Sequence, residues 1–153
     1  MSFVIETKNP KQTEKIGYQL AQLAVANDQI TLNGQLGTGK TTFTNGFAKG
    51  LDIKSAITSP TYNIVNSYDG KIKLHHFDLY RLENQDIDYQ FLELIEQPAV
   101  SILEWAQFAP ELVKEDHLIV NLTIQDNWHL LEFKSTGQRS QNWLEQFIKT
   151  YEN

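Results

Sequence analysis

A run of nine residues in the first third of the chain has the composition and spacing of a phosphate-binding loop. Residues 34–42 read Gly-Gln-Leu-Gly-Thr-Gly-Lys-Thr-Thr and fit the pattern G-x-x-x-x-G-K-[ST]. Glycines let the backbone turn tightly and point its N–H groups at an anion. Lys40 would bring a positive charge to the β- and γ-phosphates of a nucleotide, and the hydroxyl of Thr41 could ligate Mg²⁺. The loop therefore predicts a nucleoside triphosphate and Mg²⁺ as ligands.

The residues on either side of this loop have the patterns of a strand and a helix, which is the context the motif needs. Ile30 and Leu32 alternate with polar neighbours over residues 29–33, which indicates a strand. A helix is predicted over residues 40–51, because one apolar face recurs every four residues at Phe43, Phe47 and Leu51.

Two carboxylates follow strand-like segments and could complete such a site. The apolar run 99–103 predicts a buried central strand, and it ends in Glu104. This is the pattern of a Walker B acid that holds Mg²⁺ or its water, with a solvated surface acid as the alternative. The dipeptide Asp-Gly at 69–70 predicts a hairpin between strands over 63–68 and 71–78. Asp78 would then lie near the end of its second strand.

Two further segments carry weaker signals. Residues 57–62 place hydroxyl side chains around Pro60 and could be a switch segment that contacts the γ-phosphate or Mg²⁺ through Thr61, with a plain turn as the alternative. His75 and His76 resemble a metal-binding pair, but adjacent residues of a strand point to opposite faces. A metal site on both histidines is therefore not predicted.

The chain contains two arginines, Arg81 and Arg139. Phosphoryl-transfer sites often use arginine to neutralise the charge of the transition state. Either residue could serve in this way, and a surface salt bridge is the alternative for Arg81.

The remaining segments predict an α/β fold, with a mixed parallel and antiparallel sheet flanked by helices. Strands are expected at 3–7, 117–125 and 128–134, helices over 10–26 and 140–151, and a short helix within the segment 83–97, which is polar at first. The first helix has a start signal in Asn9 and Pro10. Gly46 and Gly50 weaken the helix after the loop by about 1 kcal/mol each relative to alanine, and close packing against the sheet is one reason to keep them.

Composition limits the class of protein. The 153 residues suit a single domain, residues 1–153, and the absence of cysteine excludes disulfides and thiol catalysis. A net charge of −6 argues against broad, unaided binding to nucleic acid. The sequence has neither a signal peptide pattern nor an apolar run of about 20 residues, so we expect a cytoplasmic protein without a membrane span.

Four segments, taken together and in this order, resemble the TsaE (YjeE) family, a small bacterial P-loop ATPase of tRNA threonylcarbamoyladenosine synthesis. They are Gly-Gln-Leu-Gly-Thr-Gly-Lys-Thr-Thr-Phe (34–43), Ser-Pro-Thr-Tyr (59–62), His-Phe-Asp-Leu-Tyr-Arg (76–81) and Leu-Glu-Trp (103–105). Many relatives carry an acid where this chain has Gln35. Because that position precedes the phosphate contacts, the difference concerns the charge of the loop more than its function.

The resemblance implies a P-loop NTPase-like three-layer fold with an ATP–Mg²⁺ site. It assigns Lys40, Asp78 and Glu104 to catalysis, and Thr41 and Glu104 to Mg²⁺. The nucleotide contacts it implies are Leu36, Gly37, Thr38, Gly39, Lys40, Thr41, Thr42, Thr61 and, for the adenine, Thr13.

Family members work with two partner proteins that transfer threonylcarbamoyl to the adenosine beside the tRNA anticodon. The resemblance therefore implies slow ATP hydrolysis by the isolated protein, stimulation by these partners, and only indirect contact with tRNA. A small-molecule kinase and a nucleotide-gated binding module remain as alternatives. The sequence has no Asn-Lys-x-Asp guanine signature, which favours ATP over GTP.

Overall fold

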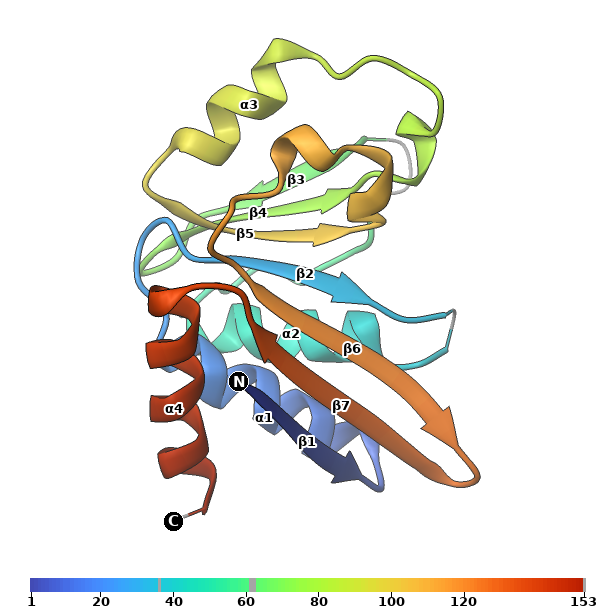
Figure 1. The fold of residues 1–153 in the computed structure, drawn as a ribbon, viewed down its shortest axis with the longest axis vertical. Helices are drawn as coiled ribbons and strands as arrows, with labels where there is room; N and C mark the ends of the chain where they lie inside the picture. The colour runs from blue at the N-terminus through green and yellow to red at the C-terminus, as the bar shows by residue number, and fades with distance from the viewer. Residues whose placement is uncertain (36, 61–62, 153) are drawn as a thin grey trace.

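The computed structural model describes residues 1–35, 37–60 and 63–152. Two expected nucleotide contacts, Leu36 and Thr61, lie outside the described residues. Figure 1 shows the order of the elements. The strands are β1 (Ser2–Thr7), β2 (Gln29–Asn33), β3 (Val65–Tyr68), β4 (Lys73–Asp78), β5 (Ala99–Glu104), β6 (Leu118–Gln125) and β7 (Trp128–Ser135). The α-helices are α1 (Pro10–Gln22), α2 (Lys40–Gly50), α3 (Tyr89–Glu96) and α4 (Gln138–Glu152).

All of these strands join one sheet, in the order β1-β7-β6-β2-β5-β4-β3. β2 is parallel to β5 and to β6, and β4 is parallel to β5. The pairs β1–β7, β6–β7 and β3–β4 are antiparallel. The sheet is therefore mixed, as predicted, and the predicted hairpins at 63–78 and 117–134 are both confirmed.

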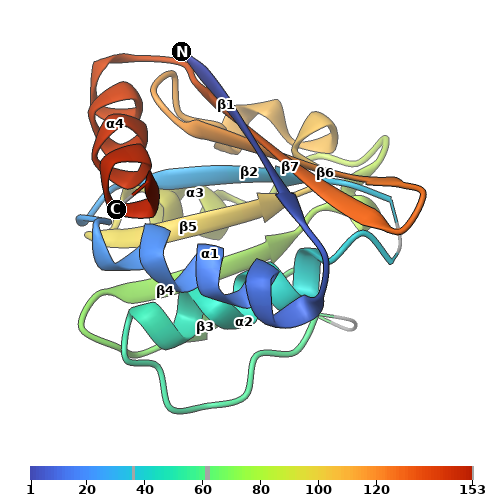
Figure 2. The same ribbon diagram turned by 90° about the horizontal axis from the view of Figure 1, so that it is seen from below.

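Helices cover both faces of the sheet, so the fold has three layers (Figures 1 and 2). Adjacent residues of a strand point to opposite faces, and the two faces build separate cores. Leu74 and Ile102 pack in the core that contains residues of α1, α2 and α4. Phe77 and Leu103 pack in the other core, with α3 and two short 3₁₀ turns, η2 (Ala106–Phe108) and η3 (Pro110–Leu112). β5 is buried along its whole length because it lies between the two cores.

The parallel strands bring three chemically important segments to one edge of the sheet. β2, β4 and β5 run in the same direction, so their carboxyl ends meet at the same edge. The register pairs Leu32 at the end of β2 with Glu104, and Glu104 in turn with Asp78. The glycine-rich loop continues from β2 at this edge. The fold thus places the loop beside both predicted acids.

Two glycines of α2 allow this helix to pack closely against α1. A Cβ atom at Gly46 would clash with the backbone carbonyl of Glu14, and one at Gly50 would clash with the carbonyl of Tyr18. The expectation that these glycines pack against the sheet is therefore wrong, because their close neighbour is the backbone of α1. This contact fixes α2, and with it the end of the phosphate-binding loop.

The first helix is shorter than predicted. It begins as expected, with the side chain of Asn9 accepting the N–H of Gln12 at 3.0 Å. It ends at Gln22 instead of near Ala26, because the chain then turns through Asn27, whose φ is 78°.

The short helix predicted within residues 83–97 is confirmed as α3, which begins at Tyr89. Asn84 has a positive φ of 61°, which no α-helix accommodates. The helix starts where Asp88 can cap it, since this side chain accepts the N–H of Gln90 at 3.0 Å.

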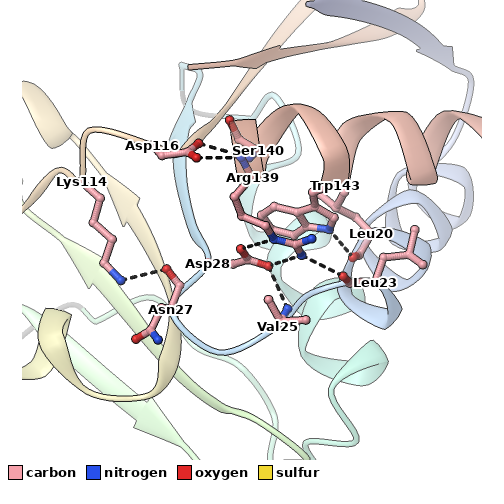
Figure 3. A network of polar contacts seen from close by, with 10 residues as sticks. All are labelled: Leu20, Leu23, Val25, Asn27, Asp28, Lys114, Asp116, Arg139, Ser140 and Trp143. Carbon is pink, nitrogen blue, oxygen red and sulfur yellow. Dashed lines mark hydrogen bonds and ion pairs between the residues drawn. The ribbon is translucent and has the colours of Figure 1, made fainter. Parts of the chain in front are cut away.

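A partly buried ion pair holds α4 beside the start of β2, the strand whose other end leads into the loop (Figure 3). Asp28 immediately precedes β2, and its side chain is only 4% exposed. Arg139 donates from Nε and Nη2 to the two carboxylate oxygens of Asp28, at 3.0 and 2.8 Å. The same Nη2 donates to the carbonyl of Leu23 at 3.2 Å. One side chain therefore ties α4 to the chain between α1 and β2.

The same region explains where α4 begins. The carboxylate of Asp116 accepts the N–H of Arg139 at 2.8 Å and that of Ser140 at 3.1 Å (Figure 3). This capping of free N–H groups favours a helix start at Gln138, two residues before the predicted one.

Arg139 is consequently unavailable to the phosphate-binding loop. Its partner Asp28 precedes the first residue of β2, whereas the loop follows the last residue of that strand. The expectation that Arg139 could neutralise transition-state charge within this chain is wrong. The sequence could not show this, because the pairing joins segments 111 residues apart.

We predict that Arg139→Met destabilises the protein without affecting the loop. The substitution leaves the carboxylate of Asp28 buried without its cation, so the free energy of unfolding should fall by about 3 kcal/mol. Urea denaturation followed by circular dichroism measures this change. Lys149→Met, at an exposed position of the same helix, is the matched control and should change stability by less than about 0.5 kcal/mol. Equal effects of the two variants would contradict the assigned role of the ion pair.

Candidate nucleotide-binding site

Two glycines shape the loop between β2 and α2. Gly37 has a φ of 84° and Gly39 a φ of 105°, a region that residues with a Cβ atom rarely adopt. Between them, Thr38 closes a tight turn onto Gln35. Its hydroxyl donates to the carbonyl of Gln35 at 2.7 Å, and its N–H does so at 3.2 Å. The described part of the loop therefore makes the tight backbone turn that its glycines predicted.

Helix α2 begins directly after this loop, with Gly39 as its N-cap. A glycine has no side chain to accept the N–H groups of the first helical turn. These groups and the positive end of the helix dipole favour an anion at this position. Thr41 and Thr42 lie in this first turn, where Thr41 is exposed and Thr42 is half-buried. The predicted contacts from Gly37 to Thr42 thus lie in the loop and in the first turn of α2.

The carboxylate of Glu104 joins this loop to the neighbouring strands. Its Oε1 lies 3.3 Å from Nζ of Lys40, and its Oε2 lies 2.6 Å from Nε2 of His76. The side chains of Glu104 and His76 are 8% and 2% exposed. All three residues belong to different elements, α2, β5 and β4, so the cluster depends on the complete fold.

Glu104 is ionised at neutral pH in this cluster. Burial alone raises the pKa of its carboxyl group. The hydrogen bond and charge of His76, together with the charge of Lys40, outweigh burial and hold the pKa below its ordinary value of 4.5. The predicted Walker B acid is therefore a carboxylate paired with Lys40 of the loop.

Asp78 lies next to Glu104 in the parallel register of β4 and β5. It is half-buried, and its Oδ1 accepts the N–H of Tyr80 at 3.2 Å, which holds the side chain at the strand end. Because paired residues of neighbouring strands share a face, both acids are directed to the face that carries α2. The structure thus brings the two predicted acids together.

Thr13 lies on the other side of the loop, in a small cavity of about 150 Å³ that also includes Gly37, Gly39 and Thr42. Thr13 is buried, and its hydroxyl is hydrogen-bonded to that of Thr7 at 3.0 Å. The structure therefore places this expected adenine contact beside the loop, with its hydroxyl already in a hydrogen bond.

His129 was missed by the sequence reasoning and lines the same small cavity. Its Nδ1 lies 2.8 Å from the carbonyl of Thr38. Because a carbonyl can only accept, Nδ1 carries the proton in this contact. The bond anchors the loop to the start of β7. No local motif signals this role, because it depends on how the β6–β7 hairpin lies against the loop.

A larger cavity of about 790 Å³ opens on the other side of the loop. Trp105, directly after Glu104, forms part of its wall, and the Nζ of Lys40 lies 5.5 Å from the centre of the indole ring. Trp105 has a φ of 59°, which ends β5 and turns the side chain toward Tyr80 and Phe108, with ring centroids 5.1 and 5.8 Å away. Other residues that line the cavity are Leu32, Asn33, Gln35, Thr38, Asn121 and Glu132.

The arrangement of side chains fits a metal ion that is held jointly with a ligand. Among the described residues, no three histidine, aspartate or glutamate side chains gather as a ligand cluster. His75 points away from the site and is hydrogen-bonded to Ser67 and Gln97. Any divalent cation at Glu104 would therefore need ligands from the nucleotide or from water.

This geometry defines an α/β protein of the P-loop-like class, with a glycine-rich loop between a central strand and a helix and an acid on the adjacent strand. Comparisons with known proteins specify the family. The sequence profile described as "Threonylcarbamoyl adenosine biosynthesis protein TsaE" matches residues 7–131. The chain belongs to the TsaE family.

Individual relatives agree with this assignment. A Bacillus subtilis protein named "tRNA threonylcarbamoyladenosine biosynthesis protein TsaE" is 38% identical over 135 residues, which cover 87% of this chain and 85% of the relative. A protein of the same name from Haemophilus influenzae is 30% identical and covers 77% of each chain. The crystal structure of Bacillus subtilis YdiB superimposes with a TM-score of 0.83 at 30% identity, covering 100% of this chain and 97% of the other.

We predict an energetic coupling between Lys40 and Glu104. Glu104→Gln removes the anion that pairs with a lysine whose side chain is only 15% exposed, so the free energy of unfolding should fall by about 2 kcal/mol. Adding Lys40→Met to this variant should restore part of the loss, because the unpaired cation is removed as well. Urea denaturation of the two single variants and the double variant gives the coupling energy. Strictly additive effects would contradict the pairing.

Proposed function

We propose that this protein binds ATP with Mg²⁺, hydrolyses it, and acts in this way in tRNA threonylcarbamoyladenosine biosynthesis. The observation that carries the proposal is the cluster at the carboxyl edge of the sheet, where Lys40 of the loop lies 3.3 Å from the acid Glu104. The biological process is the one named for the relatives that cover most of this chain.

The loop suits a triphosphate in shape and charge. Gly37 and Gly39 take backbone conformations in which no side chain covers the loop. The N–H groups at the start of α2 have no capping side chain, and Lys40 supplies a positive charge beside them. We assign the β- and γ-phosphates to these groups, since backbone N–H groups and a lysine are the usual partners of nucleotide phosphates.

Mg²⁺ fits the oxygen atoms that surround this loop. Oε1 of Glu104 and the hydroxyl of Thr41 are the protein oxygens assigned to it, directly or through water. When bound, the ion neutralises part of the charge on the phosphate oxygens. Glu104 is well suited to this role because its other oxygen, Oε2, is already fixed by His76.

Asp78 is assigned to the attacking water. It is an acid in register with Glu104, and its Oδ1 accepts the backbone N–H of Tyr80, so we assign its other carboxylate oxygen to accepting a proton or orienting water. Lys40 compensates charge on the phosphates, and Trp105 lies beside it in the wall of the large cavity.

Partner proteins are expected to complete the site. Of the two arginines, Arg139 is paired with Asp28 at the opposite end of β2, which leaves Arg81 three residues after Asp78. Sites without an arginine directed at the γ-phosphate typically lose about 10³–10⁵ in rate. We therefore propose slow hydrolysis by the isolated chain and stimulation by the two proteins of the threonylcarbamoyl-transfer complex. Contact with tRNA would be indirect, because a net charge of −6 disfavours direct binding to the phosphate backbone.

We predict that Lys40→Ala weakens ATP binding by about 10- to 100-fold, because a hydrogen bond to a charged group contributes about 1.5–3 kcal/mol. Calorimetric titration in Mg²⁺ measures the affinity, and quenching of Trp105 fluorescence should report the same event. Lys149→Ala, on the exposed surface of α4, is the control and should bind as the unmodified chain does. Equal affinities of all three proteins would contradict the assignment of the loop.

We further predict that hydrolysis depends on the partners and on Asp78. Turnover of the isolated chain should be slow and should rise when both partner proteins are added, with little change when tRNA is added alone. Asp78→Asn should retain ATP binding and lose most of the stimulated rate. Rapid turnover without partners, or an Asp78→Asn variant that fails only in binding, would contradict this assignment and would favour a self-sufficient enzyme such as a kinase.

A further inference from the structure

His76 carries out no step of the proposed reaction, yet it makes the shortest polar contact with the acid at the site. We propose that His76 is a positioning residue, which locks one oxygen of Glu104 so that the other is presented to a divalent cation beside the nucleotide loop. This inference rests on the proposed function and assigns it one further residue.

The two oxygens of Glu104 face different partners. Oε2 lies 2.6 Å from Nε2 of His76, and Oε1 lies 3.3 Å from Nζ of Lys40. His76 is 1% exposed and belongs to β4, which is adjacent to β5 in the sheet. Because a buried ring on a central strand has little freedom to move, its bond to Oε2 prevents the carboxylate from rotating. Only Oε1 is then directed at the loop.

The direction of this hydrogen bond follows from the partners. An ionised carboxylate has no proton to donate, so Nε2 of His76 carries the proton and donates it to Oε2. A donor at this position leaves Oε2 less available to a cation. A metal ion that approaches Glu104 therefore meets one oxygen with a fixed orientation, which is the role that outer hydrogen bonds generally have in metal sites.

The other ring nitrogen shows that packing alone does not account for His76. Its Nδ1 is buried and has no hydrogen-bond partner among the residues that the structure describes. Burying an unpaired polar atom is unfavourable, and an apolar ring of similar size would avoid that penalty. The contact that justifies a histidine here is the bond from Nε2 to Glu104.

The neighbouring histidine provides a matched control. His75 is also 1% exposed and belongs to the same strand, but it points to the opposite face of the sheet. It is hydrogen-bonded to Ser67 at 2.7 Å and to Gln97 at 2.9 Å and has no contact with Glu104. Replacing His75 therefore disturbs the same strand, β4, without removing a contact to the acid.

The test compares His76→Phe, His76→Gln, His76→Asn and His75→Phe in the full-length protein. Binding of a non-hydrolysable ATP analogue is measured by calorimetry, once with excess Mg²⁺ and once with EDTA. The ratio of the two affinities is the gain due to Mg²⁺. This readout does not depend on turnover, and a purely structural role of His76 would leave the ratio unchanged.

In His76→Phe the gain due to Mg²⁺ should fall by about 10- to 100-fold, with the affinity in EDTA little changed. His76→Gln should retain most of the gain, because a glutamine amide can donate from the place of Nε2. His76→Asn should lose it, because the shorter side chain does not reach Glu104. His75→Phe should keep the full gain.

An unchanged gain in folded His76→Phe would overturn the inference, and so would an equal loss in His75→Phe. If the phenylalanine variant does not fold, the comparison of His76→Gln with His76→Asn decides, and equal gains in these two would also overturn it. A wild-type protein that binds the analogue without any gain due to Mg²⁺ contradicts both this inference and the proposed cofactor. Failure of the wild-type protein to bind the analogue at all contradicts the proposed function.

Discussion

The buried carboxylate of Glu104 is the constraint around which the edge of the sheet is organised. An ionised group in the interior is costly unless cations and donors surround it. Lys40 and His76 meet this need, and they come from α2 and β4, while Glu104 ends β5. The pairing is possible only if β2, β5 and β4 are parallel neighbours and if α2 starts directly above their carboxyl ends. The electrostatic requirement of one side chain thus links the strand order, the loop and the position of the helix.

A second buried carboxylate, Asp28, lies at the opposite end of β2. There the carboxylate of Asp28 accepts hydrogen bonds from Nε and Nη2 of Arg139 and from the N–H of Val25 at 2.8 Å. These partners belong to α4 and to the chain around Asp28, so the cluster holds α4 in place. At the loop, by contrast, Lys40 and the start of α2 retain groups directed outward. Two buried acids of the same chain therefore serve different purposes, according to whether their partners are saturated.

Much of this arrangement could be predicted from local pattern. The glycine-rich loop, the strand before it, the buried strand ending in Glu104 and the mixed sheet all have short-range signals in residue type and period. The structure confirms the strands and the sheet. What the sequence did not show are contacts between distant segments. Arg139 finds Asp28 and His129 finds Thr38 across 111 and 91 residues, and the glycines of α2 face α1 rather than the sheet. A metal site on both histidines was not predicted, because adjacent residues of a strand point to opposite faces. The same alternation of side chains along β4 directs His76 to Glu104.

The position of Lys40 has a consequence for the order of events at the site. This one cation already neutralises Glu104, yet the proposed function also requires it at the nucleotide phosphates. If Lys40 turned to the phosphates alone, Glu104 would face them as an anion held only by its hydrogen bond to His76, and its repulsion from the phosphates would be unfavourable. A divalent cation at Oε1 removes this conflict, because it is attracted to both anions. Nucleotide and cation should therefore bind cooperatively, and by linkage each strengthens the other to the same extent. The exchange of one lysine between two anions is sufficient to couple them.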